Sequence, residues 1–291
     1  MKIGQRGAAT AAAPARDIEV GTSGGLTLRG RWWPRPDPRG TLVIAHGFGE
    51  HGGTFRHVAE SLGPALAIDV VAVDFRGHGR SPGRRGVVRR YDELTDDLHG
   101  VLEWTARRRP DLPRFLLGHS NGGQVALRSA LANPAPINGL IVSNPALRIA
   151  LPIPPYKLKL GRFLLQHAPW ITLNSPMRVH LLTRDPEVQR QHLADRLRHH
   201  RMSAPLFFGM VEGGEMLLRR AAEIRVPTLL IVGGQDPVVD PAAARQLYDH
   251  LCSEDRTLLL YPKMLHEPLN ELGREQVLDD VVRWIEGRLN H

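Results

Sequence analysis

The chain has 291 residues, of which 42% are hydrophobic and 23% are charged, and its formal net charge is +8 at pH 7. This length is sufficient for one large α/β domain or two small ones, and the composition is typical of a soluble globular protein. No stretch approaches a membrane-spanning length of about 18 apolar residues, so we expect no integral membrane segment and a cytoplasmic location. A single cysteine, Cys252, excludes an intramolecular disulfide and argues against a structural zinc site.

The basic residues are spread along the chain in short groups, at positions 84–85, 89–90, 107–109 and 219–220. They occur without an aromatic RNA-binding motif, a zinc-finger spacing or a basic helix that leads into heptads. We therefore predict solvated surface and no nucleic-acid partner. At the start of the chain, Lys2 and Arg6 precede an alanine tract that lacks the leucine-rich core of a signal peptide, which predicts a disordered N-terminal tail at 1–16.

Strand and helix patterns alternate up to residue 145. Continuous apolar runs predict buried strands, and the amphipathic runs between them predict helices. In chain order they are strands at 26–33 and 41–47, a helix at 55–62, a strand at 67–77, a helix at 91–109, a strand at 114–120, a helix at 121–133 and a strand at 137–145. This alternation predicts an α/β fold with a mostly parallel central sheet and helices on both faces.

The alternation breaks between residues 146 and 225, where helical patterns and prolines replace the strands. Helical segments are predicted around 157–173, 185–201 and 215–224, without a strand. The rhythm then resumes with a strand at 226–236, a helix at 241–251, a strand at 256–262 and a helix at 275–289. We predict an α/β core formed by 17–145 and 226–291, and a helical cap, or lid, at 146–225.

A first glycine motif, G-x-G-x-x-G, runs from Gly47 to Gly52 after a predicted strand. Asp74 lies 22 residues beyond Gly52, close to where a dinucleotide-binding fold has its ribose-binding acid. This motif keeps one alternative open, a dinucleotide-binding oxidoreductase. Against it, earlier strand signals precede this strand, whereas such a fold normally begins with it.

A second motif, G-x-S-x-G, is formed by residues 118–122 around Ser120. It ends an apolar strand and begins an apolar helix, the context in which a nucleophilic serine occupies a strained turn between small residues. A serine that only capped the helix would not need glycines on both sides, because capping requires only a side-chain oxygen near free amides. The sequence therefore favours a nucleophile over a structural serine.

A nucleophilic serine needs a base and an acid that orients the base. In the chain order serine, acid, histidine, Asp236 follows one predicted strand and His266 follows the next. Asp240 is a rival acid, but it precedes Pro241 and is more typical of a helix cap. These residues predict Ser120, Asp236 and His266 as a catalytic triad.

Four other histidines have simpler interpretations. His46 ends a strand and is expected to order the first glycine loop, and His119 is expected to point away from the serine. His199 and His200 lie in an arginine-rich helical stretch and are expected to be solvated. Metal binding there would need a third ligand at a suitable spacing, so no metal site is predicted.

Six stretches resemble the monoacylglycerol lipase group of the serine α/β-hydrolases, also described as lysophospholipases or serine aminopeptidase-like (S33) hydrolases. They are HGFGEHGGTFRHVAE (46–60), VDFRGHGRSPGRRG (73–86), LGHSNGG (117–123), TRDPEV (183–188), PTLLIVGGQDPVVDP (227–241) and YPKMLHEPLNE (261–271). The resemblance implies an α/β-hydrolase fold and no cofactor. It also implies that the backbone N–H groups of Phe48 and Asn121 hold the substrate oxyanion, and that Glu50 and His51 order the loop beside the substrate pocket.

The sequence departs from the group's pattern in two places. Members often carry methionine after the nucleophile, whereas Asn121 is expected to place an amide at the acyl pocket. The later Asp-Pro of the cap is Asp195-Arg196 here. Substrate-lining candidates in the cap, with ordinary core packing as the alternative, are Leu158, Phe163, Trp170 and Ile171. The arginines between 76 and 90 follow a strand end, which suggests a contact with anionic lipid interfaces.

The sequence thus predicts a serine hydrolase of carboxylic esters, a monoacylglycerol lipase or carboxylesterase that forms an acyl-enzyme. A lysophospholipase or peptidase of the same fold is the alternative. The partner is a small lipid or ester substrate, a peripheral membrane contact stays open, and the oligomeric state is not determined. Activity should rise with pH around about 6.5, the reference pKa of histidine, as His266 becomes neutral.

Overall fold

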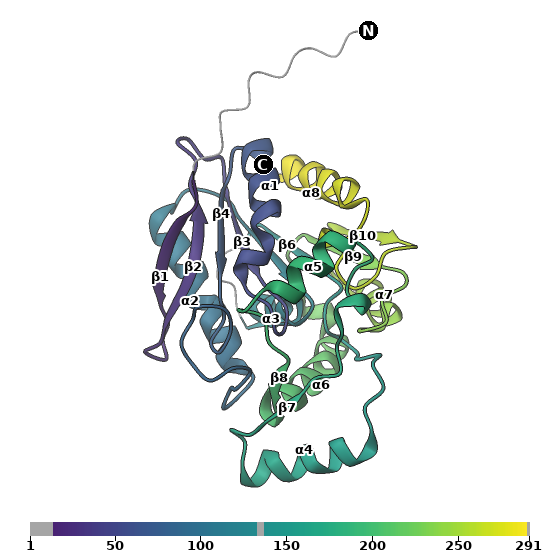
Figure 1. The fold of residues 1–291 in the computed structure, drawn as a ribbon. Coiled ribbons are helices and arrows are strands. Elements are labelled where there is room, and N and C mark those ends of the chain that lie inside the picture. Colours follow the sequence, from purple (N-terminus) through teal and green to yellow (C-terminus); the bar gives the residue numbers. More distant parts are fainter. Residues whose placement is uncertain (1–13, 133–136, 290–291) are drawn as a thin grey trace.

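The computed structural model describes residues 14–132 and 137–289, so the predicted tail lies almost entirely outside the described residues. Its centre is an eight-stranded sheet with the order β1-β2-β4-β3-β5-β6-β9-β10 (Figure 1). The pairings β1–β2 and β2–β4 are antiparallel, and all the others are parallel. The strands are β1 (Arg16–Gly21), β2 (Thr27–Trp33), β3 (Thr41–Ala45), β4 (Asp69–Val73), β5 (Arg114–His119), β6 (Gly139–Ser143), β9 (Thr228–Gly233) and β10 (Arg256–Tyr261).

The inner strands are apolar because both of their faces are covered. Every residue of β3, β4, β5, β6 and β9 is buried. This confirms the prediction from their continuous apolar runs. Strand β1 was not predicted, because its sequence RDIEVG is charged and mostly exposed at the edge of the sheet, where only one partner strand holds it.

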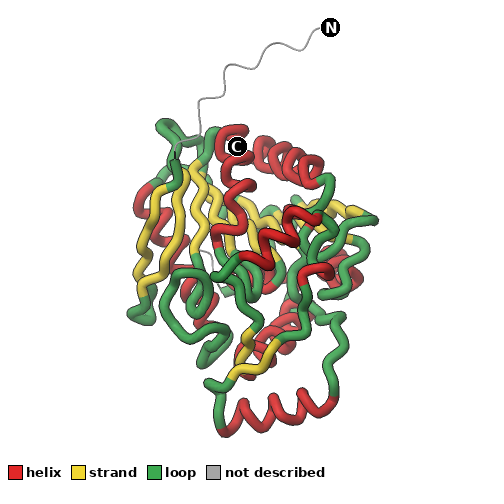
Figure 2. Tube along the Cα trace, in the orientation of Figure 1, coloured by secondary structure: helices red, strands yellow, loops and turns green. Residues whose placement is uncertain are grey.

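Helices cover the sheet on both sides (Figure 2). On one face, α1 (Arg56–Leu66) packs against α8 (Arg274–Leu289), and on the other α2 (Asp92–Arg108) packs against α3 (Asn121–Leu131), with α7 (Pro241–His250) beside β9. Two buried apolar clusters result, one on each face. The first contains side chains of α2, α3 and α7, and the second contains side chains of α1 and α8. The predicted α/β fold with two helical layers is therefore confirmed.

The segment between β6 and β9 contains α4 (Pro155–His167), α5 (Pro186–Ala194) and α6 (Ala204–Arg219). Figure 1 shows α4 at the outer end of this segment, away from the sheet. We use the name cap for residues 146–225. The prediction of no strand here was wrong, because β7 (Thr172–Asn174) and β8 (Arg201–Ser203) form an antiparallel pair. Three-residue strands leave no periodic pattern, and their pairing depends on tertiary contacts.

Helix α6 begins at Ala204, well before the predicted start near Glu215. Ser203 caps it by accepting a hydrogen bond from the Leu206 N–H, and Pro205 lies in its first turn. A capping serine followed by a proline in the first turn is typical of a helix start. The other prolines of the cap made this signal hard to recognise in the sequence. No helix within 14–132 or 137–289 is long and apolar enough to cross a membrane.

Candidate active site

Ser120 lies in the turn between β5 and α3, at the carboxyl edge of the sheet. Its backbone has φ +52° and ψ −119°, and its side chain makes no capping bond to α3. The flanking glycines are required for this turn. A Cβ on Gly118 would lie 2.5 Å from the Gly122 carbonyl oxygen, and a Cβ on Gly122 would lie 2.2 Å from the Ala45 carbonyl oxygen. The turn therefore leaves the hydroxyl free for another partner, at a cost in backbone strain.

That partner is His266. The distance from Ser120 Oγ to His266 Nε2 is 2.8 Å, and the distance from His266 Nδ1 to Asp236 Oδ2 is 2.7 Å. All three side chains are buried. The structure thus brings together the three residues predicted from the sequence, in the arrangement that lets a histidine take a proton from a serine while a carboxylate orients the ring.

Asp236 lies in the loop after β9, where the backbone holds its carboxylate in place. Its Oδ1 accepts hydrogen bonds from the N–H groups of Val238 and Val239, at 2.7 and 3.1 Å, so Oδ2 is available to His266. The rival acid Asp240 instead caps α7 by accepting from the Ala242 N–H. The placement of these two carboxylates agrees with the positions by which the sequence analysis separated them.

The charged groups around His266 favour its protonated form. Burial alone would lower the pKa of His266, but the Asp236 carboxylate outweighs it and holds that pKa above the ordinary value. The carboxylates of Glu267 and Glu50 act in the same direction. We therefore expect a transition midpoint above the reference value of histidine on which the sequence analysis relied.

The glycine loop (residues 47–52) lies directly against the nucleophile. A Cβ on Gly47 would lie 3.2 Å from the Ser120 Cβ. The Phe48 N–H in this loop and the Asn121 N–H at the start of α3 find no acceptor within the described ranges. Two free backbone donors beside a nucleophilic serine could stabilise an oxyanion.

In the same loop, the N–H groups of the first and last glycines of the G-x-G-x-x-G motif are already hydrogen-bonded within the protein. The Gly47 N–H donates to Glu50 Oε1 at 2.5 Å, and the Gly52 N–H donates to Asp74 Oδ1 at 2.8 Å. Asp74 also accepts from the Arg80 N–H, so its carboxylate orders loops and has no free face for a ribose. Phosphate binding in a dinucleotide fold requires free N–H groups. The occupied glycine N–H groups and the occupied carboxylate of Asp74 therefore argue against the alternative of a dinucleotide-binding oxidoreductase.

Two of the other histidines behave as predicted. His46 orders the glycine loop: its Nδ1 donates to the Gly47 carbonyl at 2.7 Å, and its Nε2 accepts from the Phe75 N–H. His119 is directed at the Ser143 carbonyl and not at the nucleophile. Burial lowers the pKa of both histidines to about 3, so both are neutral.

The expectation of a solvated His199 was wrong, whereas His200 is exposed. The His199 ring packs against Phe48 and His78, with centroid distances of 5.7 and 4.7 Å, and burial lowers its pKa to about 3. No cluster of three potential metal ligands occurs in the described part of the chain.

Asn144, after β6, is a site residue that the sequence analysis missed. It has a positive φ of 41°. Its Nδ2 donates to the carbonyls of Leu265 and His266, and its Oδ1 accepts from the Gly233 N–H. It therefore connects the loops that carry the base and the acid. The sequence signal was an Asn-Pro pair at a strand end, which is equally typical of an ordinary turn.

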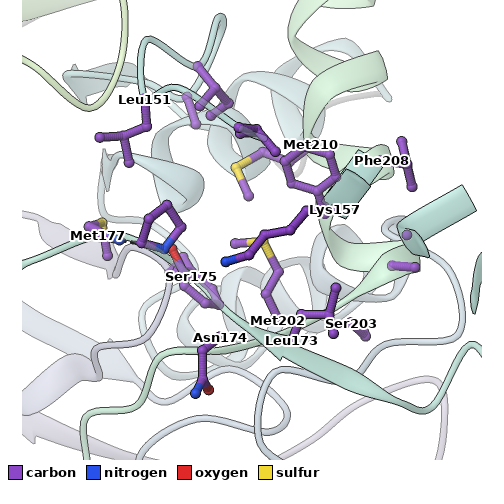
Figure 3. Close-up of a pocket in the computed structure, with 18 of the residues that line it drawn as sticks. Leu151, Lys157, Leu173, Asn174, Ser175, Met177, Met202, Ser203, Phe208 and Met210 are labelled. Carbon is purple, nitrogen blue, oxygen red and sulfur yellow. Dashed lines mark hydrogen bonds between the residues drawn. The ribbon is translucent and has the colours of Figure 1, made fainter. Parts of the chain in front are cut away.

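An apolar pocket, partly open to solvent, lies between the core and the cap (Figure 3). Ser120 and Phe48 line it, and its other walls come from the loop after β6 and from α4, β7 and α6. The labelled wall residues include Leu151, Leu173, Met177, Met202, Phe208 and Met210. Lys157 on α4 is a cation among them. Ser120 thus faces a pocket whose apolar walls suit an acyl chain.

The predicted lining residues divide into two groups. Leu158 lines the pocket, whereas the other three cap residues do not: Phe163, Trp170 and Ile171 are 57%, 53% and 42% exposed. Helix α4 has apolar side chains on both its faces, so its sequence could not show which face is turned inward.

Glu50 and His51 are buried within the loops and order them, but they do not line the pocket.

The side chain of Asn121 does not reach the acyl pocket either. It is buried, and its Oδ1 accepts a hydrogen bond of 2.7 Å from the Tyr91 hydroxyl. Arg128 lies over the Tyr91 ring at 4.4 Å. The amide expected at the pocket is instead part of the packing between α2 and α3.

Three of the six arginines between 76 and 90 form ion pairs within the fold. Arg76 forms a bidentate pair with the buried Asp97 and a further ion pair with Glu93. Arg80 pairs with Asp17, and Arg89 pairs with Glu93. Arg84 and Arg90 are exposed. Ion pairs within the fold therefore engage three of the six cations on which the expected contact of this loop with anionic lipid was based.

The fold, the strained serine and its hydrogen-bonded histidine and aspartate define an α/β-hydrolase. A family model described as serine aminopeptidase, S33, matches residues 36–273, and the chain belongs to this family.

Individual relatives are similar along nearly the whole chain. The monoacylglycerol lipase of Mycolicibacterium smegmatis is 36% identical over 259 residues, which cover 89% of this chain and 92% of that protein. Phospholipase YtpA of Bacillus subtilis is 27% identical, over 84% of this chain and 94% of that protein. The crystal structure of the monoacylglycerol lipase of Paleococcus ferrophilus has a TM-score of 0.80 at 28% identity, over 95% of this chain and 100% of that one.

Proposed function

We propose that this protein is a monoacylglycerol lipase, which cleaves medium or long acyl esters of glycerol through an acyl-enzyme on Ser120. That the chain is an ester hydrolase follows from its family, its fold and its lipase relatives. The observation that carries the substrate proposal is the position of Ser120. It lines an apolar pocket and is hydrogen-bonded to His266, which is in turn bonded to the buried Asp236.

The geometry assigns a role to each group. Ser120 Oγ attacks the ester carbonyl carbon while its proton moves to Nε2 of His266. The carbonyl oxygen becomes an oxyanion that the N–H groups of Phe48 and Asn121 stabilise. When the carbon–oxygen bond to glycerol breaks, the imidazolium returns the proton to the alcohol. Water, deprotonated by His266, then attacks the acyl-serine and releases the fatty acid.

The pocket fits the acyl half of the substrate. The leaving alcohol must lie next to His266, because that ring supplies its proton. The residues around the pocket include Ser120 and Phe48 but not His266. The pocket is therefore on the acyl side of the reacting carbon, and the glycerol leaves on the other side.

A lysophospholipase is the alternative within the same class. The phospholipase of Bacillus subtilis among the relatives favours it. The acyl pocket would serve both substrates, since they differ in the alcohol that leaves. A comparison of a monoacylglycerol with a lysophospholipid of the same acyl chain therefore separates the two proposals.

We also propose that the outer face of the cap contacts the lipid surface that supplies the substrate. Exposed apolar side chains gather on α4 and directly after it: Tyr156, Leu160, Phe163, Leu165, Trp170 and Ile171. Lys157, Lys159 and Arg162 on the same helix carry positive charge. Aromatic and basic side chains together are typical of helices that lie at a membrane interface.

The first experiment measures hydrolysis of p-nitrophenyl esters, from acetyl to palmitoyl, and of a monoacylglycerol and a lysophospholipid with one acyl chain. Wild type is compared with Ser120→Ala, and Ser61→Ala, an exposed serine on α1, is the matched control. We expect a peak at medium or long chains, a preference for the monoacylglycerol, and loss of activity only in Ser120→Ala. Equal turnover by Ser120→Ala and wild type would contradict the nucleophile, and a preference for the lysophospholipid would contradict the substrate.

A further inference from the structure

Arg198, in the cap segment between α5 and β8, lies between two buried carboxylates of the core. Its two terminal nitrogens lie 3.5 Å from Glu50 Oε2 and 3.5 Å from Glu267 Oε1. The side chain of Arg198 is 10% exposed, and those of Glu50 and Glu267 are 2% and 3% exposed. A buried arginine that contacts two carboxylates from different loops holds those loops at a defined separation.

Each carboxylate belongs to a loop of the proposed catalytic machinery. Glu50 accepts a hydrogen bond from the Gly47 N–H, the residue before the proposed oxyanion donor Phe48. Glu267 directly follows His266, and its side chain is held by Asn270 at 2.9 Å. Arg198 thus connects the loop of the oxyanion donor to the loop of the base.

The charges of these three side chains explain why an arginine is needed between the two loops. Burial and the neighbouring Glu267 raise the pKa of Glu50, whereas Arg198 and His192 overcome burial and lower the pKa of Glu267. Two buried carboxylates near one another repel when both are ionised. The guanidinium is therefore what allows the two loops to approach each other.

The remaining contacts dock the same cap segment on the glycine loop. The His199 N–H donates to the Gly49 carbonyl at 2.9 Å, and His51 Nε2 lies 2.7 Å from Asp195 Oδ2. A Cβ on Gly49 would lie 2.3 Å from the His199 carbonyl oxygen, so the two backbones touch. Residues 195–199 therefore bring Arg198 into place as a docked unit.

We propose that Arg198 is a positioning residue, through which the docked cap sets the oxyanion donor at Phe48 and the base His266 in register with Ser120. This inference rests on the proposed function, since it assigns a task to Phe48 and His266. It makes the cap part of the catalytic assembly in addition to a wall of the pocket. Arg198 acts through Glu50 and Glu267 and does not touch the substrate.

The test compares Arg198→Met with Arg196→Met, which removes an exposed arginine two residues away. A soluble p-nitrophenyl ester is the substrate, and the thermal unfolding temperature is measured for each variant. We expect kcat to fall about 100-fold in Arg198→Met, because a misplacement of about 1 Å costs that much, while KM changes little. Arg196→Met should retain wild-type kcat.

The double variant Arg198→Met/Glu267→Gln distinguishes the role of Arg198 in positioning the two loops from the effect of its charge on His266. Removing the cation alone leaves two carboxylates near His266, so the acid limb of the kcat/KM profile should move to higher pH in Arg198→Met. Removing one carboxylate as well restores the net charge of the cluster. We expect the pH profile of the double variant to return toward that of wild type while kcat stays low, because the connection between the loops is still absent.

Recovery of kcat together with the pH profile would show that Arg198 only balances charge, and would overturn the proposal. Wild-type kcat in Arg198→Met would overturn it as well. If Arg198→Met is unfolded, Arg198→Lys decides: a lysine keeps the charge but cannot contact both carboxylates with a fork, so kcat should still fall. The proposed function fails separately, if wild type shows no activity that depends on Ser120.

Discussion

At the scale of single residues, backbone geometry fixes the positions of Ser120 and Asp236, whereas neighbouring charges control the protonation of His266. The strained turn at Ser120 depends on Gly118 and Gly122, where any side chain would collide with a neighbouring backbone. Asp236 is held by two backbone N–H groups, so one carboxylate oxygen is always presented to His266. The protonation state of His266 is therefore the property of the site that the solution pH changes.

The pH dependence follows from the raised pKa of His266. The base must be neutral to accept the serine proton, so activity should rise with pH through a midpoint above the ordinary histidine value of about 6.5. The measurement is kcat/KM for a soluble ester between about pH 5 and about pH 9. Asp236→Asn should lower the midpoint, because the main group that raises the pKa is removed. A wild-type midpoint below the ordinary value would contradict this account.

Lys157 should limit the use of long neutral acyl chains. It projects from α4 into a pocket whose other labelled wall residues are mostly apolar (Figure 3), and it forms no ion pair with a described residue. Its ammonium keeps water near part of the acyl chain. Lys157→Met should raise kcat/KM for long chains by about fourfold for each additional CH₂ that becomes buried.

The measurement for Lys157 is the p-nitrophenyl ester series with wild type and both variants. Lys159→Met removes an exposed charge from the same helix and is the matched control. The acetyl ester, which is too short to reach α4, should be hydrolysed equally by all three proteins. A uniform change at every chain length would argue against the proposed position of the acyl chain.

At the scale of elements, α4 differs from the core helices because apolar side chains occupy its outer face. Helix α2 has its apolar residues buried against the sheet, whereas α4 has only Gly161 and Leu164 buried and packs mainly against α6. An exposed apolar stripe of this kind in a hydrolase of lipid esters is best explained by contact with the lipid phase.

Removing two of the three exposed aromatic rings of this surface should weaken vesicle binding. Phe163→Ser/Trp170→Ser is expected to lower the partition coefficient on phosphatidylcholine vesicles by at least about tenfold, from the apolar area no longer buried. Co-sedimentation with vesicles measures the coefficient. Leu193→Ser, at a 77% exposed residue on α5, is the matched control and should bind like wild type. Unchanged binding by the double variant would disprove the lipid contact.

At the scale of the whole molecule, the sheet separates two apolar clusters that are nonetheless parts of one structure. Leu98 of α2 lies in one cluster and Leu62 of α1 in the other, and both side chains are fully buried. Each Leu→Ala substitution should lower the free energy of unfolding by about 2 to 5 kcal/mol. Because the strands lie between them, the two effects should add to within about 0.5 kcal/mol.

Urea unfolding of the two single variants and the double variant tests this additivity. Leu193→Ala, on the exposed surface of α5, should change the free energy of unfolding by no more than about 0.5 kcal/mol. A large departure from additivity would show that the clusters are coupled through the sheet, contrary to the expectation.

The sequence by itself determined the alternating α/β core and the three residues of the Ser120 site. Buried parallel strands need continuous apolar runs, and a serine at a tight strand–helix turn needs glycines on both sides, so both features leave local signals. Asp236 and His266 were identifiable because each follows a strand in the chain order of the α/β-hydrolases. Their hydrogen-bonded arrangement agrees with that prediction, while their catalytic roles stay proposals until tested.

Only the tertiary structure decided the features that depend on contacts between distant segments. It showed which face of α4 meets the pocket, where the side chain of Asn121 points, and that β7 pairs with β8. It also showed that Arg198 meets Glu50 and Glu267, which are 148 and 69 positions away in the chain. One arginine among several in a polar stretch has no local signal of its own, because its partners are determined by the packing of the cap on the core and not by its neighbours in sequence.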